Sequence, residues 1–117
     1  MRLLLAVCFV VVLGGNARAE QFVETRGFGD VPCATYAEVY RKYQDEGEVN
    51  NKYFSWALGF ISGINVMQES FFVDLGAKTE DEMKRYLRQY CDAHPLANYK
   101  DGVRELMKTL PIIRRQK

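Results

Sequence analysis

The stretch WALGFISGIN, Trp56–Asn65, decides the fold, because it forms the centre of an uncharged run that extends from Tyr53 to Gln68. Within this run Phe54, Leu58 and Ile61 recur at spacings of three and four, which is the signature of one helix face. If the run is helical, apolar residues lie on almost every side of the helix. A helix of this kind is buried on most of its sides, so the stretch predicts the central helix of a small bundle.

This helix is expected over about residues 50–69, and it carries a GxxxG pattern at Gly59 and Gly63. In a membrane that pattern is typical of a dimerisation face, but the run is shorter than the roughly 20 residues that a span needs. We therefore expect Trp56 and both glycines to pack closely against another helix of the bundle. A homodimer built on the same face is the alternative. Asn65 lies on or near the buried face, and its amide should bond a neighbouring helix or loop backbone.

Three further helices are predicted around this central one. The first covers about residues 32–44, and the last covers about residues 98–109 and stops before Pro111. The helix between them opens with a capping box, in which Thr79 and Glu82 can each satisfy a free backbone donor.

No segment alternates between apolar and polar residues with the period of a strand. The sequence thus predicts an all-α fold, a small bundle of about four helices over residues 32–110. An extended segment is expected over 20–31 and a flexible tail over 111–117.

The N-terminus has the pattern of a secretory signal peptide over residues 1–19. Arg2 precedes the apolar run Leu3–Leu13, and Ala17-Arg18-Ala19 matches a cleavage site after Ala19. The rival interpretation, an uncleaved anchor, requires a longer apolar run. We expect a periplasmic or secreted protein with no stable membrane span after cleavage.

Two cysteines, Cys33 and Cys91, remain after that cleavage. A pair of cysteines in an exported chain predicts a disulfide. A metal site is the rival use, but it needs further ligands and the chain has one histidine, His94. We predict neither a metal nor a cofactor. His94 precedes Pro95 at a helix end, where it would cap carbonyl groups; a role as a pH sensor or ligand is the alternative.

The remaining features favour binding over catalysis. No paired carboxylates, nucleophile motif or metal set stands out, so we expect a non-enzymatic protein. The formal net charge is +1 and the basic residues are interspersed, which speaks against a nucleic-acid partner. Phe71 and Phe72 fall in a predicted loop, where two adjacent large apolar groups indicate a partner surface. Tyr53 and Tyr86 are the tyrosines that we add to this surface, because tyrosine is favoured at interfaces.

The order of these elements resembles two groups of small periplasmic helical proteins. The Cys33 and Cys91 spacing, with Asn98-Tyr99-Lys100-Asp101, is similar to the HdeA/HdeB acid-stress chaperones. The elements Gly59-Phe60-Ile61-Ser62-Gly63 and Tyr86-Leu87…His94-Pro95 are similar to the Rap/Tai-type immunity proteins, which neutralise secreted cell-wall amidases. The resemblance implies a non-enzymatic protein-binding role and assigns no catalytic residue.

The expected function is therefore to bind another protein in the periplasm, either a client or a secreted enzyme. A structural envelope protein without a specific client is the first alternative, and a small hydrolase is the second.

Overall fold

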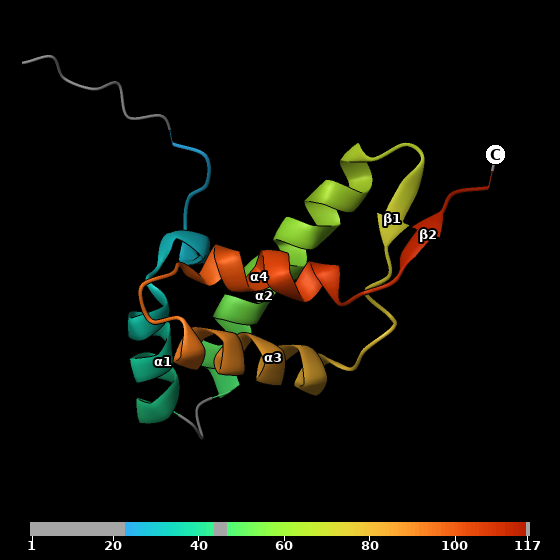
Figure 1. Ribbon diagram of the computed structural model, residues 1–117. Coiled ribbons are helices and arrows are strands. Elements are labelled where there is room, and N and C mark those ends of the chain that lie inside the picture. Colours follow the sequence, from blue (N-terminus) through green and yellow to red (C-terminus); the bar gives the residue numbers. More distant parts are fainter. Residues whose placement is uncertain (1–22, 44–46, 117) are drawn as a thin grey trace, which may run out of the picture.

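The computed structural model of the chain describes residues 23–43 and 47–116 (Figure 1). In chain order the elements are η1 (Phe28–Asp30), α1 (Cys33–Lys42), α2 (Gly47–Met67), β1 (Phe71–Val73), α3 (Glu80–Ala93), α4 (Tyr99–Lys108) and β2 (Ile112–Arg114). The predicted helical bundle with one disulfide is confirmed. The predicted signal peptide, residues 1–19, lies outside the described residues, as does the end expected for the first helix at Gln44.

Local hydrogen bonds begin the two C-terminal helices where the sequence predicts them. The Thr79 backbone N–H donates to the Glu82 carboxylate at 2.7 Å, and the Glu82 N–H donates to the Thr79 hydroxyl at 3.2 Å. At the start of α4 the Asn98 backbone N–H donates to the Asp101 carboxylate at 2.9 Å. These capping boxes satisfy donors that a helix end otherwise leaves free.

The disulfide joins the first residue of α1 to the last turns of α3. The Cα atoms of Cys33 and Cys91 lie 4.6 Å apart, and neither side chain is exposed. The same junction is held by backbone bonds, since the Cys33 N–H donates to the Ala97 carbonyl and the Tyr99 N–H donates to the Val31 carbonyl. The start of α1 is therefore attached to both α3 and the turn that leads into α4.

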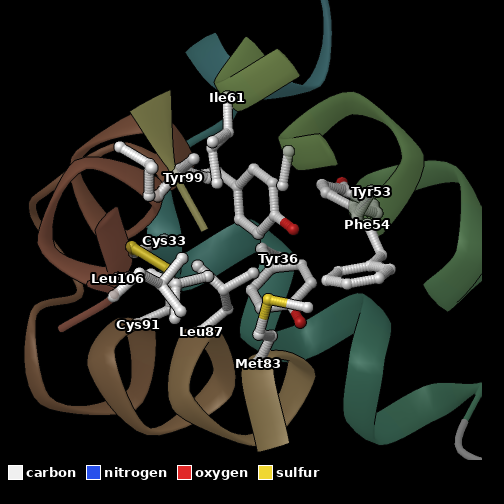
Figure 2. Packing of buried hydrophobic residues seen from close by; sticks show 14 residues of the cluster. Cys33, Tyr36, Tyr53, Phe54, Ile61, Met83, Leu87, Cys91, Tyr99 and Leu106 are labelled. Carbon is white, nitrogen blue, oxygen red and sulfur yellow. A yellow bond between two sulfur atoms is a disulfide. The ribbon is translucent and has the colours of Figure 1, made fainter. Parts of the chain in front are cut away.

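The core lies where α2 crosses the other helices, and aromatic side chains fill much of it (Figure 2). The ring centroids of Tyr36, Tyr53 and Tyr99 lie between 4.8 and 5.2 Å from one another. Burial raises the pKa of Tyr36 to about 12 and also raises the pKa of Tyr99. From α2 the predicted Phe54 and Ile61 are buried, whereas Leu58 is half-buried. The remaining buried members of this cluster are Cys33, Ala57, Val73, Met83, Leu87, Cys91, Val103, Leu106 and Leu110.

The chain differs from the sequence prediction in two places that form one sheet. Phe71–Val73 lies in the predicted loop and Ile112–Arg114 lies in the predicted flexible tail, yet the two segments pair as antiparallel strands. The sheet extends beyond the ends of α2 and α4, at the opposite end of the molecule from α1 (Figure 1). Strands of three residues are too short to show an alternating pattern, so the sequence gives no sign of them.

The segment that leads to α1 also differs from the extended form expected over residues 20–31. Its described part ends in the 3-10 turn η1, which packs against α2 and α4. The carboxylate of Asp30 accepts a hydrogen bond from Lys100 on α4 at 3.1 Å, and the indole N–H of Trp56 donates to the Arg26 carbonyl at 3.0 Å. This segment therefore covers one side of α2.

Candidate protein-binding groove

An apolar groove of about 610 Å³ opens on the surface where α2, α4 and the sheet meet. Its floor consists of six apolar side chains and its rim of three charged ones. The floor is formed by Phe60, Ile64, Phe71, Val73, Met107 and Ile112, and the rim by Glu24, Arg104 and Lys108. We call these nine residues the apolar groove.

The helix α2 places two of these side chains on one face. Phe60 and Ile64 are four residues apart, so they lie one above the other on the helix surface. The ring of Phe60 stacks on Trp56, with centroids 5.2 Å apart, and this contact holds it at the edge of the groove. One turn beyond Ile64, Met67 is 80% exposed. The apolar face of α2 thus continues past the core and remains open to solvent.

The sheet supplies the opposite wall because of its register. Phe71 pairs with Arg114, and Val73 pairs with Ile112, which places all four side chains on the same face of the sheet. Val73 is buried, whereas Phe71 is 39% exposed and Ile112 is 67% exposed. Two large apolar side chains therefore stand at the open mouth of the groove.

Charged side chains at the rim already have partners within the chain. Arg104 on α4 forms an ion pair with Glu24, which attaches the N-terminal segment to the edge of the groove. Lys108 donates a hydrogen bond to Glu105 at 2.6 Å, and this bond raises the pKa of the lysine. The floor has no nucleophile and no paired acids. Its apolar side chains suit the burial of an apolar segment.

The predicted partner surface is only partly assembled. Phe71 lines the groove. Phe72 points to the other face of the sheet, where the guanidinium of Arg115 lies 5.2 Å from its ring centre. Tyr53 is 6% exposed and belongs to the aromatic core, so its assignment to a surface is wrong. Tyr86 is half-buried and packs against the core. The groove also contains Ile64, Met107 and Ile112, which come from three separate elements and are not predicted as partner-surface residues from the sequence.

The residues predicted to pack α2 against another helix behave differently from one another. A Cβ atom added at Gly59 or at Gly63 would meet nothing within 4 Å, so the expected close helix contact is wrong. Trp56 instead packs against the N-terminal segment, where a Cβ atom at Gly29 would lie 2.1 Å from its ring. Asn65 bonds backbone, as predicted, and its partner is Val73 of β1.

His94 occupies the capping position that the sequence indicates. Its backbone N–H donates to the Tyr90 carbonyl at 2.9 Å, its Nδ1 lies 2.9 Å from the same oxygen, and its ring stacks on Tyr90 at 4.2 Å. These contacts hold the end of α3.

A second, more polar cavity of about 290 Å³ lies between α1, α2 and α3. Lys84 in this cavity bonds Asn51 at 3.2 Å. The guanidinium of Arg88 lies 4.4 Å from the ring centre of Tyr40, and its buried Nε has no hydrogen-bond partner among the described residues. The apolar groove, whose floor is uncovered, is the stronger candidate.

Residues 23–43 and 47–116 contain no cluster of three or more histidine, cysteine or acidic side chains that could hold a metal. No helix in this part of the chain is long and apolar enough to cross a bilayer.

The comparisons with known proteins give no relative: no family model, no curated protein and no solved structure matches this chain.

Proposed function

We propose that this chain is an exported, non-enzymatic protein that binds another protein, and that the apolar groove is its docking surface. The observation that carries the proposal is the open floor of the groove, with Phe71 and Ile112 exposed at its mouth. A hollowed apolar surface with a charged rim is typical of a place where a partner docks. Export rests on the signal-peptide pattern of residues 1–19.

Two mechanisms follow from the resemblance described above, and the rim of the groove favours one of them. The N-terminal segment is held beside the groove by the carboxylates of Glu24 and Asp30, each paired with a base on α4. Acid that protonates the Asp30 carboxylate would remove its ion pair with Lys100. The segment would then separate from α2 and widen the apolar surface, while the disulfide keeps α1 attached to α3. This behaviour suits a chaperone of the HdeA type that protects clients in acid.

An inhibitor of the immunity type would instead keep a rigid surface and block one secreted enzyme. The experiment that separates the two mechanisms is light scattering of an acid-labile client, such as alcohol dehydrogenase, at pH 2–3. Far-ultraviolet circular dichroism of the protein alone is recorded in parallel. A chaperone would suppress scattering while it loses helicity. A protein that keeps its helicity and leaves the client to aggregate would favour the inhibitor.

Two matched variants test whether the groove is responsible for client protection. Ile112→Lys places a charge at the mouth of the groove, and Leu96→Lys places the same charge at a side chain that is 100% exposed and lies outside it. Lysine is the right substitution because it stays charged in acid, where glutamate would be neutral. We expect Ile112→Lys to abolish protection and Leu96→Lys to retain it. Equal protection by both variants would contradict a role for the groove.

A further inference from the structure

The two edges of the sheet are not equivalent. The hydrogen bonds from the Asp74 N–H to Pro111 and from the Arg115 N–H to Ser70, both 2.9 Å, establish which residue pairs are bonded. Alternation along an antiparallel pair then makes Phe72 and Ile113 a bonded pair. Val73 and Ile112 form a non-bonded pair, as do Phe71 and Arg114. The backbone N–H and C=O groups of these four residues therefore point outward, toward the two edges of the sheet.

The outward groups of β1 are covered at Val73. The side-chain amide of Asn65 donates to the Val73 carbonyl at 2.9 Å, and the Val73 N–H donates to the Asn65 side-chain oxygen at 2.8 Å. An asparagine from α2 therefore occupies the position that a neighbouring strand would take.

The outward groups of β2 have no such cover. Within residues 23–43 and 47–116, no side chain or further strand bonds the N–H or C=O of Ile112 and Arg114. All three residues of β2 are exposed. An uncovered edge of this kind is a template for another strand.

The open edge is continuous with the apolar groove, because Ile112 belongs to both. A strand added beside β2 would place alternate side chains on the face that carries Phe71, Val73 and Ile112. Those side chains would extend the floor of the groove, and the side chains between them would face the other way. The backbone of such a strand could bond Ile112 and Arg114 in the way that peptides add to the sheet edges of other binding domains.

The charge along this edge favours an acidic strand. Arg114 ends β2 with its side chain on the face of the groove, whereas Arg115 already donates to the Gln68 carbonyl and Lys108 to Glu105. In an antiparallel pair of two copies of β2 about a two-fold axis, Ile112 of one copy would lie opposite Arg114 of the other, so neither Arg114 would face a carboxylate. The edge therefore disfavours a second copy of this chain and suits carboxylates.

We propose that β2 takes an extended segment of the partner protein as a third strand, with an apolar residue beside Ile112 and a carboxylate beside Arg114, both on the face of the groove. This inference rests on the proposed protein-binding function and specifies the form of the partner. The occupant is a stretch in which an acidic and an apolar residue stand two positions apart, exposed in a protein that is unfolded or that has a free strand.

The test uses fluorescein-labelled peptides as probes: Thr-Glu-Thr-Val-Thr-Val-Thr, in which Glu and both Val share one face of the strand, the same peptide with Lys in place of Glu, and the acidic peptide with its central Val replaced by Pro. Binding to the full mature protein is measured by fluorescence anisotropy at pH 7. Backbone amide shifts in ¹⁵N-labelled protein locate the site. We expect the acidic peptide to bind and to shift the amides of Ile112 and Arg114. The Lys and Pro peptides should not bind.

Two variants at one position separate charge from backbone bonding. Arg114→Gln keeps the outward N–H, and we expect it to weaken binding about three- to fivefold through loss of one exposed ion pair. Arg114→Pro also removes the outward N–H, which the pairing with β1 does not use, and a proline is tolerated at such an edge. We expect it to weaken binding at least about fivefold more. Equal affinity of the two variants would overturn the third strand.

Failure of this inference is distinguishable from failure of the proposed function. If no peptide binds while Ile112→Lys still abolishes client protection, the groove binds proteins but not as a third strand. If sedimentation shows a dimer that Arg114→Pro dissociates, the occupant of the edge is a second copy, and the assignment to a partner is wrong.

Discussion

Asn65 and Val73 form the contact that joins the end of the central helix to the sheet. Two hydrogen bonds, of 2.9 and 2.8 Å, link the side-chain amide of Asn65 to the carbonyl and the N–H of Val73. Val73 is 6% exposed, so water can barely reach these groups. The side-chain amide of Asn65, within WALGFISGIN, therefore bonds backbone groups at the edge of β1 rather than a ligand.

Replacement of Asn65 should separate the sheet from the bundle. Asn65→Ala leaves a buried donor and a buried acceptor of Val73 unpaired, and we expect a loss of about 2–4 kcal/mol in the free energy of unfolding. Asn65→Asp keeps an acceptor for the Val73 N–H but offers no donor at neutral pH. If the bond to the Val73 N–H contributes most of the stabilisation, Asn65→Asp should lower the free energy of unfolding less than Asn65→Ala does. Urea unfolding followed by circular dichroism measures both. Loss of less than about 0.5 kcal/mol in Asn65→Ala would show that the sheet does not depend on this contact.

Glycine substitutions distinguish the two sides of α2. Gly29→Ala would place a Cβ atom 2.1 Å from the ring of Trp56, so we expect overpacking to cost about 1–3 kcal/mol. Gly63→Ala meets no atom within 4 Å and should stabilise the helix by up to about 1 kcal/mol.

The same Gly63 variant tests the dimer alternative of the GxxxG face. If Gly59 and Gly63 form a homodimer interface, sedimentation equilibrium would show that Gly63→Ala weakens self-association. An unchanged oligomeric state, together with a higher melting temperature, would remove this alternative.

Removal of the disulfide should destabilise the fold without changing its topology. The bridge spans a sequence separation of 58 residues, and loss of the constraint on the unfolded chain corresponds to about 4 kcal/mol in the chain-entropy model. We expect the double variant Cys33→Ala/Cys91→Ala to unfold at a lower urea concentration. Addition of a reductant should lower the midpoint of the parent protein and leave that of the double variant unchanged. A reductant effect on both would indicate a different cause.

Acid should weaken the fold through two identified carboxylates. Hydrogen bonds from Thr79 hold the pKa of Glu82 below its usual value, and hydrogen bonds from Thr25 and Lys100 do the same for Asp30. Because the folded pKa is lowered in both cases, the stabilisation is present above the unfolded pKa and is lost as the pH falls below about 4. Asp30→Asn should therefore flatten the decline of stability between pH 5 and about pH 2, measured by urea midpoints. An unaltered decline would show that other groups control the acid response.

Much of the helical architecture is readable from the sequence because its signals are local. The capping box of Thr79 and Glu82 places the start of α3, and Asn98 with Asp101 places the start of α4. The cysteine count identifies the disulfide. Each of these features depends on residues that are close in sequence or on a pairing without rivals.

The groove could not be predicted because its parts meet only through long-range pairing. Ile112 and Phe71 stand on strands that are far apart in the chain, and neither strand is long enough to show alternation. Tyr53 shows the opposite error. Tyrosine is favoured at interfaces, yet the ring of Tyr53 packs among other aromatic rings in the core.

Site-specific photo-crosslinking tests the central claim, that the apolar groove binds protein, most directly. The photoreactive residue benzoylphenylalanine replaces Ile112 in one variant and Leu96 in another, since both side chains are exposed but only Ile112 lines the groove. Producing cells are irradiated at neutral pH and after a shift to pH 2–3. The account predicts protein adducts at position 112 and none at position 96. The absence of adducts at 112, or the same adducts at both positions, would contradict it.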